Sequence, residues 1–237
     1  MSEKNAHQLI EVCFSSPKEA RALLKKEPNL IHEKTEFGET PLHYLVVENQ
    51  LNSVQLLVEY GANVNTKNKC GATPLSNASS LGYLELVKYL LSQGAKVTGD
   101  VGFGETTLHE GVKSGNPDII KILIENGVEI EAQNGMKETA LHVSASDDER
   151  VRVTKFLIEK GANINAQGLF SDTPLHKAAL HNSMKNVVVL VEHGASLKIT
   201  DSQNCTPSEL AFNAKNKAVY EYLVHESGNP NSSFQSN

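Results

Sequence analysis

Apolar residues recur along the chain at positions i, i+3 and i+4, the spacing that places them on one face of a helix. Four such sets are Val54/Leu57/Val58, Val87/Leu90/Leu91, Ile120/Leu123/Ile124 and Val187/Leu190/Val191. A glycine follows each set and can supply the left-handed residue that ends a helix; these are Gly61, Gly94, Gly127 and Gly194. We therefore predict one amphipathic helix per set, with its apolar face in a core.

A polar marker precedes each of these helices at a nearly constant interval. It is a threonine, found at Thr40, Thr73, Thr106, Thr139, Thr173 and Thr206, in steps of 33, 33, 33, 34 and 33 residues. Threonine is a good N-cap and proline fits the first helical position. In residues 35–67 we accordingly predict one helix from Pro41 to about Asn49 and a second from about Leu51 to Tyr60. Each unit is predicted to run turn, helix, tight loop, helix.

The segment Thr40-Pro41-Leu42-His43, repeated at this period together with a Gly-Ala ending, resembles the ankyrin repeat. The resemblance implies an all-α ankyrin-repeat solenoid of about seven helix-turn-helix units with hairpin-like turns, capped at both ends. The predicted domain covers residues 1–225, in units of about 4–34, 35–67, 68–100, 101–133, 134–167, 168–200 and 201–225. The first unit lacks the motif and is predicted as helices over 5–14 and 17–26, and residues 226–237 are predicted to be a disordered tail.

Histidines at one repeated place raise the question of metal binding or catalysis. His43, His109, His142 and His176 share that place, and Ser76 takes it in a fifth unit. In proteins with ankyrin-like repeats this histidine ties adjacent turns by hydrogen bonds, and the resemblance implies the same role here. Units one repeat apart hold the rings too far apart to share a metal. The chain also lacks the nucleophile-elbow, phosphate-loop and zinc-helix motifs. We predict no enzymatic activity, no metal and no cofactor.

The charge and the cysteine content indicate which kinds of partner and which cell compartment to expect. The net charge is −6, from 28 acidic and 22 basic residues, which gives no electrostatic footprint for nucleic acid or for an anionic membrane. Three widely spaced cysteines argue against a disulfide framework and favour a reducing compartment. No signal peptide and no apolar run of about 20 residues is seen. A soluble protein in the cytoplasm is expected, with nuclear or secreted-effector delivery left open.

The turns carry the first candidate for a binding surface. The residue before the usual turn glycine, or its substitute, is apolar in five of six units. These five tip residues are Phe37, Cys70, Phe103, Met136 and Phe170, and the acids close to them are Glu39, Glu105, Glu138 and Asp172. One interpretation is a stripe that binds a partner with apolar residues among basic ones. The other is that the tip side chains fold back onto neighbouring turns.

The resemblance implies a second candidate surface, the concave face formed by the first helix of each unit. The matching positions are Val47, Glu48, Leu81, Lys113, Asp147, Leu180 and His181. Near Asp147 the unit from Thr139 to Glu149 is one residue longer than the others. This extra residue is either a tolerated loop insertion or a local acidic bulge that contacts a partner. In animal relatives, asparagines placed like Asn65 and Asn165 can be β-hydroxylated, so both are candidates for that modification.

The function predicted from these features is a non-catalytic protein-protein interaction module, an adaptor or scaffold that acts as a monomer. It would bind a protein partner through turn tips and concave face. One alternative is a receptor for a small ligand or nucleotide, which would need a basic cluster, and only Lys113, Lys177 and His181 are near the groove. A stand-alone enzyme and an oligomeric role are further alternatives.

Overall fold

The computed structural model describes residues 2–97, 99, 101–102 and 104–228, with side chains from His7 onward. Within these residues the chain folds into helices that come in seven successive pairs. The all-α repeat class predicted from the sequence is confirmed. The two helices of a pair are called A and B below, in chain order.

The A helices are α1 (Ser2–Ser15), α3 (Pro41–Val47), α5 (Pro74–Ser80), α7 (Thr107–Lys113), α9 (Ala140–Ala145), α11 (Pro174–Leu180) and α13 (Pro207–Asn213). The B helices are α2 (Pro17–Lys26), α4 (Leu51–Glu59), α6 (Leu84–Ser92), α8 (Pro117–Glu125), α10 (Val151–Glu159), α12 (Met184–Glu192) and α14 (Lys217–Gly228). Two short 3-10 segments, η1 (Pro28–His32) and η2 (Asp148–Arg150), complete the described elements.

The helix boundaries follow local chemistry. Thr40 precedes α3 in an extended conformation, as an N-cap residue should, and Pro41 is the first helical residue. We predicted that this helix would continue to about Asn49, but it ends at Val47, because Asn49 adopts a left-handed φ of 53° that stops the helix. The B helix of the same unit spans Leu51–Glu59 and is followed by Gly61 at a φ of 96°.

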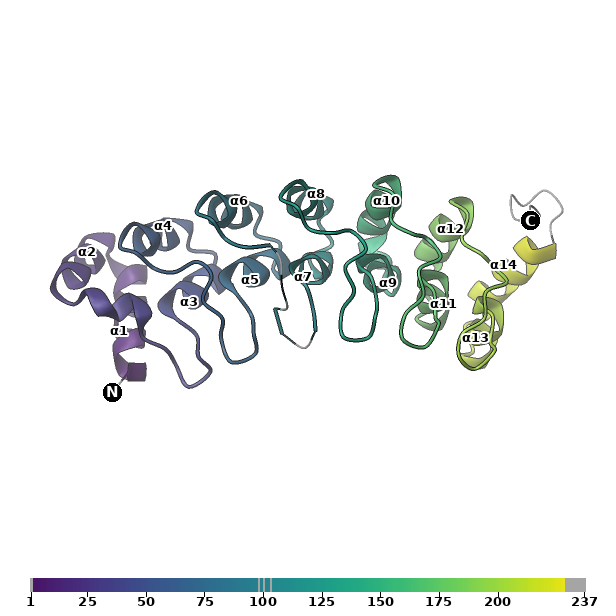
Figure 1. Ribbon diagram of the computed structural model, residues 1–237, viewed down its shortest axis with the longest axis horizontal. Helices are drawn as coiled ribbons and strands as arrows, with labels where there is room; N and C mark the ends of the chain where they lie inside the picture. The colour runs from purple at the N-terminus through teal and green to yellow at the C-terminus, as the bar shows by residue number, and fades with distance from the viewer. Residues whose placement is uncertain (1, 98, 100, 103, 229–237) are drawn as a thin grey trace. The chain divides into compact units, whose positions relative to one another are not determined.

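The chain divides into two compact units, each a stack of helix pairs (Figure 1). Unit 1 is Met1–Ser114 with Lys121–Val128, and unit 2 is Gly115–Ile120 with Glu129–Asn237. In unit 1, helices α1, α3, α5 and α7 pack in sequence; in unit 2, α9, α11 and α13 do so. The first two positions of each apolar set predicted for the B helices lie in the core, and the leucines Leu57, Leu90, Leu123 and Leu190 are each 0% exposed. The third position is half-buried at Val58, Leu91 and Ile124. Each repeat therefore buries its apolar face against its neighbours.

The turns between pairs extend from the same side of the A helices within each unit (Figure 1). One backbone hydrogen bond joins successive tips: the N–H of Lys69 donates to the carbonyl of Phe37 over 2.9 Å, and that of Leu169 to the carbonyl of Met136 over 2.9 Å. Since these bonds use backbone atoms only, the tip side chains are left to face outward.

The two ends differ from the inner repeats. The first pair, α1 and α2, matches the predicted 5–14 and 17–26 helices, with α1 slightly longer. At the other end α14 continues to Gly228, so residues 226–228, predicted as the start of a disordered tail, belong to the helix. The remainder of that predicted tail, residues 229–237, lies outside the described residues.

Candidate protein-binding surface

The repeated histidines are buried and tie each repeat to the next. The ring Nδ1 of His43 accepts from the backbone N–H of Thr40 at 3.2 Å, and its Nε2 donates to the carbonyl of Ala72 at 3.2 Å. In unit 2 the same Nε2 bond runs from His142 to Asp172 at 3.1 Å and from His176 to Cys205 at 3.0 Å. The structural role implied by the resemblance is confirmed at these three places.

Burial keeps these rings neutral. It lowers the pKa of His43 to about 4, although the bond to Ala72 opposes the shift. The pKa values of His142 and His176 are also lowered, again chiefly by burial. A neutral ring that accepts at Nδ1 carries its proton on Nε2, which is the tautomer needed to donate to the next turn. All ring nitrogens of these three side chains are thereby used in structure.

In the repeat where Ser76 replaces the histidine, the backbone of its turn lies very close to the backbone of the next turn. Ser76 completes its own N-cap, accepting from the N–H of Thr73 at 2.9 Å, but its short side chain bonds only within that turn. Here a Cβ added to Gly102 would lie 1.9 Å from the carbonyl oxygen of Cys70, so only glycine fits, and its φ is 118°. This glycine is required for the two turns to meet.

The tip residues that the structure describes are exposed. Phe37 is 59% exposed in unit 1, and Met136 and Phe170 are 43% and 52% exposed in unit 2. Cys70 is an exposed free thiol. Phe103 lies outside the described residues. The alternative that these side chains fold back onto neighbouring turns is not favoured by such exposure, because large apolar side chains in water are typical of interaction sites.

The acids beside the tips behave differently from one another. In unit 2 the ammonium group of Lys177 bridges two of them, the carboxylate of Glu138 and, at 3.1 Å, that of Asp172. Burial tends to lower the pKa of Lys177, but the hydrogen bonds to both carboxylates outweigh it and raise the pKa. Asp172 is itself buried, at 9% exposure. These two acids therefore face a cation of the same chain, and neither belongs to an acidic surround that is open to a partner.

The ends of the A helices present a second apolar row. In unit 1 Val47 and Leu81 are 40% and 46% exposed, as expected for the predicted face, and Phe14 joins them at 47%. Phe14 was missed because its repeat lacks the Thr-Pro-Leu-His motif, yet it lies 33 residues before Val47 and could have been found by that spacing. Glu48 is exposed beside Val47, whereas Lys113 pairs with Glu110 at 2.6 Å.

In unit 2 the exposed apolar residue at the end of an A helix is Leu180, which is 43% exposed and is followed by the exposed His181. Asp147 stands at the matching place in the longer repeat. It caps η2, accepting from the N–H of Glu149 at 3.0 Å, and it pairs with Arg150 at 3.5 Å.

The extra residue of that repeat is absorbed into packed structure. The side-chain amide of Asn186, fully buried on α12, donates to the carbonyls of Ser144 and Asp147 at 3.3 and 2.8 Å. The carboxylate of Asp148 in turn accepts from the N–H of Asn186 at 3.2 Å. Of the two interpretations of the insertion, this geometry favours a structural one, since its carbonyls and one of its acids bind the next repeat.

Asn65 and Asn165 also bridge repeats. Asn65 donates from Nδ2 to the carbonyl of Gly94 at 3.0 Å and accepts at Oδ1 from the N–H of Lys96 at 2.8 Å. Asn165 accepts from the N–H of Ser196 at 2.8 Å. Both have a structural role in the turn, and their hydroxylation stays a prediction.

Side chains that could bind a metal lie apart from one another in the described part of the chain. Among those residues no three His, Cys, Asp or Glu side chains come together as metal ligands. A search of the same residues for a helix of sufficient length and hydropathy to cross a bilayer finds none. Cys13 is buried, and burial raises the pKa of its thiol to about 11, which makes it unreactive.

Comparison with known proteins agrees with this architecture. Models of ankyrin repeats in three copies match residues 9–100 and 96–168, and one of ankyrin repeats in many copies matches residues 157–211. No curated protein matches the chain. Among solved structures, the crystal structure of the human ASB11 ankyrin repeat domain is similar, with a TM-score of 0.82 and 30% identity, over 94% of this chain and 98% of that one. The chain belongs to the ankyrin repeat family.

Proposed function

We propose that this chain is a non-catalytic protein-binding module, an adaptor or scaffold that holds a protein partner on its turn tips and on the exposed ends of its A helices. Ankyrin repeats are in general protein-protein interaction modules, which supports the class of function. The surface and its residues are our inference from exposure and spacing.

The exposed apolar side chains at the ends of the A helices of unit 1 carry the proposal. Phe14, Val47 and Leu81 lie at or directly after the ends of α1, α3 and α5 and are 40–47% exposed, and the tip residue Phe37 is 59% exposed. Side chains of this kind are often buried, and here three successive repeats each hold one in water. Because stacked repeats preorganise the surface, a partner binds with little ordering of the module itself.

A receptor for a nucleotide or small anion would need a basic cluster, and the lysines near the groove already pair with acids of the same chain. Lys177 is engaged by Glu138 and Asp172, and Lys113 by Glu110. A phosphate would have to displace these carboxylates. The protein partner fits the exposed residues better: its contact segment should be apolar, with a basic group for Glu39 or Glu48.

The test is photo-crosslinking capture from lysate of the source cells with four forms of the chain. One form is the natural sequence, one carries Phe37→Ser with Phe170→Ser, one carries Val47→Ser with Leu81→Ser, and one carries Phe212→Ser. Phe212 is 64% exposed on the last repeat and lies outside both rows, so it is the matched control. All forms must show the same helical circular dichroism signal.

We expect a protein that the natural chain and the Phe212→Ser form retain and that at least one of the two double variants releases. The variant that releases it identifies the row that binds. If both double variants and the natural sequence retain the same protein equally, the proposed surface is wrong. If no protein is retained by any form, the adaptor function itself loses its support.

A further inference from the structure

The last repeat exposes aromatic side chains where the inner repeats bury small or aliphatic ones. Phe212, in α13, is 64% exposed. Its counterparts in the five preceding repeats are Val46, Ser79, Val112, Ala145 and Ala179, all fully buried. Tyr220, in α14, is half-buried and stands where Val54, Val87, Ile120 and Val187 are fully buried. Phe212 therefore leaves apolar surface in water at a position that the other repeats bury.

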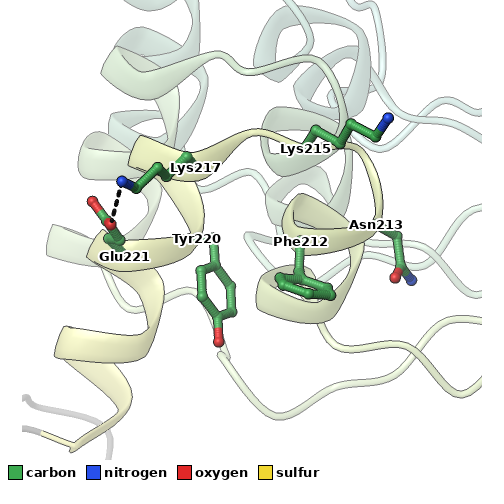
Figure 2. A pocket seen from close by; sticks show the side chains of 6 residues that line it. All are labelled: Phe212, Asn213, Lys215, Lys217, Tyr220 and Glu221. Atoms are coloured by element: carbon green, nitrogen blue, oxygen red, sulfur yellow. Dashed lines mark ion pairs between the residues drawn. The ribbon is translucent and has the colours of Figure 1, made fainter.

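The two rings and the helices that carry them form a groove. Phe212 and Tyr220 project side by side into the space between α13 and α14 (Figure 2), with ring centroids 5.3 Å apart and planes tilted by 55°. The groove has a volume of about 610 Å³ and is also lined by Asn213, Lys215, Lys217 and Glu221. One turn after Tyr220, Val224 is 45% exposed and extends the apolar surface along α14.

An ordinary further repeat does not suit this face. In the inner repeats the position of Phe212 is held by Val, Ser or Ala, which lets the next A helix pack closely, as α13 packs on α11. A phenylalanine here would hold such a helix away. The occupant must instead offer an apolar side chain to fill the groove beside the two rings.

The charges at the groove carry both signs. Lys217 pairs with Glu221 at 3.6 Å within α14, and both side chains are largely exposed, at 83% and 62%. Lys215, exposed in the loop between α13 and α14, adds a second cation. A groove of one sign would point to a partner of the opposite sign, whereas lysine and glutamate side by side can pair with a rotated copy of themselves. A two-fold contact requires this self-complementarity.

We propose that the C-terminal face of one chain docks on the same face of a second copy. Phe212 of each copy enters the groove of the other beside Tyr220, and Lys217 of each copy pairs with Glu221 of the other. The face is the surface of one helix pair, so the interface is small and the association weak, at the low end of specific contacts. This self-association uses a face apart from the partner-binding rows and does not depend on the proposed adaptor function.

The experiment is sedimentation equilibrium of the whole chain from about 1 µM to about 1 mM, a range suited to a small interface. We expect the average mass to rise from 25.8 kDa toward twice that value. Phe212→Ser should abolish the rise, and Phe37→Ser, at a similarly exposed phenylalanine, should leave it unchanged. Circular dichroism confirms that each variant is folded, and since both side chains are exposed neither substitution opens a core.

Charge variants test the pairing between copies. Lys217→Glu makes α14 acidic at this face and Glu221→Lys makes it basic, so each variant alone should remain monomeric because like charges meet. An equimolar mixture of the two should regain dimers, because one copy then offers acids and the other bases. Native mass spectrometry distinguishes the mixed dimer if one variant is isotope-labelled.

A mass of 25.8 kDa at every concentration would overturn the proposal. So would a dimer that survives Phe212→Ser, since the contact would then lie elsewhere. If Phe212→Ser abolishes the dimer but the charge variants still self-associate, the lysine-glutamate pairing is wrong and the two-fold docking argued from it fails.

Discussion

Units 1 and 2 bury the same apolar stripe but join their repeats with different polar contacts. The contrast lies at the start of the B helices, where the links of unit 1 to the preceding pair are hydroxyl groups: Ser53 donates to the carbonyl of Cys13 at 3.0 Å, and Tyr83 to that of Val47 at 3.2 Å. In unit 2 they are amides: Asn186 reaches two carbonyls of the preceding repeat, and Asn216 binds the carbonyls of Ala179 and Leu180 at 2.8 and 2.9 Å.

The turns show the same contrast. Lys177 bridges Glu138 and Asp172 in unit 2, whereas Tyr44 stands at the place of Lys177 in the second repeat of unit 1. Glu39 makes no ion pair within the residues that the structure describes. The apolar pattern therefore determines how the repeats stack, and the polar contacts between repeats vary while the stacking stays the same. In unit 2 the bonds of Asn186, Asn216 and Lys177 are therefore contacts that single substitutions can remove without opening the core.

The largest loss of stability is expected when a buried leucine in the core of one unit is truncated to alanine. Leu90→Ala in unit 1 and Leu190→Ala in unit 2 remove the same buried side chain at the same repeat position, and each should lower the free energy of unfolding by roughly 2–5 kcal/mol. Because repeats interact with nearest neighbours, the damage should first appear in the unit that carries it. Hydrogen exchange resolved along the chain measures this. A uniform loss of protection in both units would contradict it.

Acid should weaken the stack through its histidines. The pKa of His43 is about 4 in the fold and about 6.5 in the unfolded chain. The pKa of His43 is lower in the folded chain than in the unfolded chain. The contribution of the neutral ring to the free energy of unfolding is therefore complete above pH 6.5 and is lost as the pH falls toward 4. This corresponds to about 3 kcal/mol, from 1.36 kcal/mol for each unit of pKa shift.

The measurement is urea unfolding at pH 7 and at pH 4. His43→Gln should be less stable at pH 7 and should show a smaller drop between the two pH values than the natural chain. The exposed His32 provides the control, because His32→Gln should leave the drop unchanged. An equal drop in all three proteins would rule out His43 as a source of the acid sensitivity.

Removing the lysine bridge sharpens the contrast between the units. Lys177→Met leaves the carboxylates of Glu138 and Asp172, whose side chains are only 17% and 13% exposed, without their cation. We expect a loss of roughly 1.5–3 kcal/mol at pH 7, the range for hydrogen bonds to charged groups. The raised pKa of Lys177 means that the bridge is intact at neutral pH and is lost only as the pH rises through that value.

The matched control is Lys113→Met in unit 1. Its ion pair with Glu110 joins residues three apart on one helix, and the lysine is 42% exposed. Exposed pairs of this kind contribute about 0–1 kcal/mol. Urea unfolding of both variants gives the comparison. Equal losses would mean that the bridge between turns is no stronger than a pair on a single helix.

The sequence predicted the parts of the fold that repeat. The period of the threonines and the i, i+3, i+4 pattern identified the helix pairs and core residues such as Leu57 and Leu90, because every repeat buries the same positions. It could not show that Lys177 binds Glu138, since that bond joins two repeats through side chains with no periodic counterpart. It also missed Phe14 and Phe212, which lie in end repeats where the motif is degraded.

The smallest effect on stability is expected from substitutions at the turn tips. Their stability shows whether a tip side chain is free to bind a partner or is needed for the fold. Phe37 is 59% exposed, and the hydrogen bond from its tip to the next one uses the carbonyl of Phe37 and leaves the ring out. Phe37→Ser should therefore change the free energy of unfolding by no more than about 0.5 kcal/mol, as is usual for surface substitutions. Thermal and urea unfolding measure this. A loss above about 2 kcal/mol would show that the ring packs on its neighbours. The tip would then serve the fold, and Phe37 would leave the proposed binding surface.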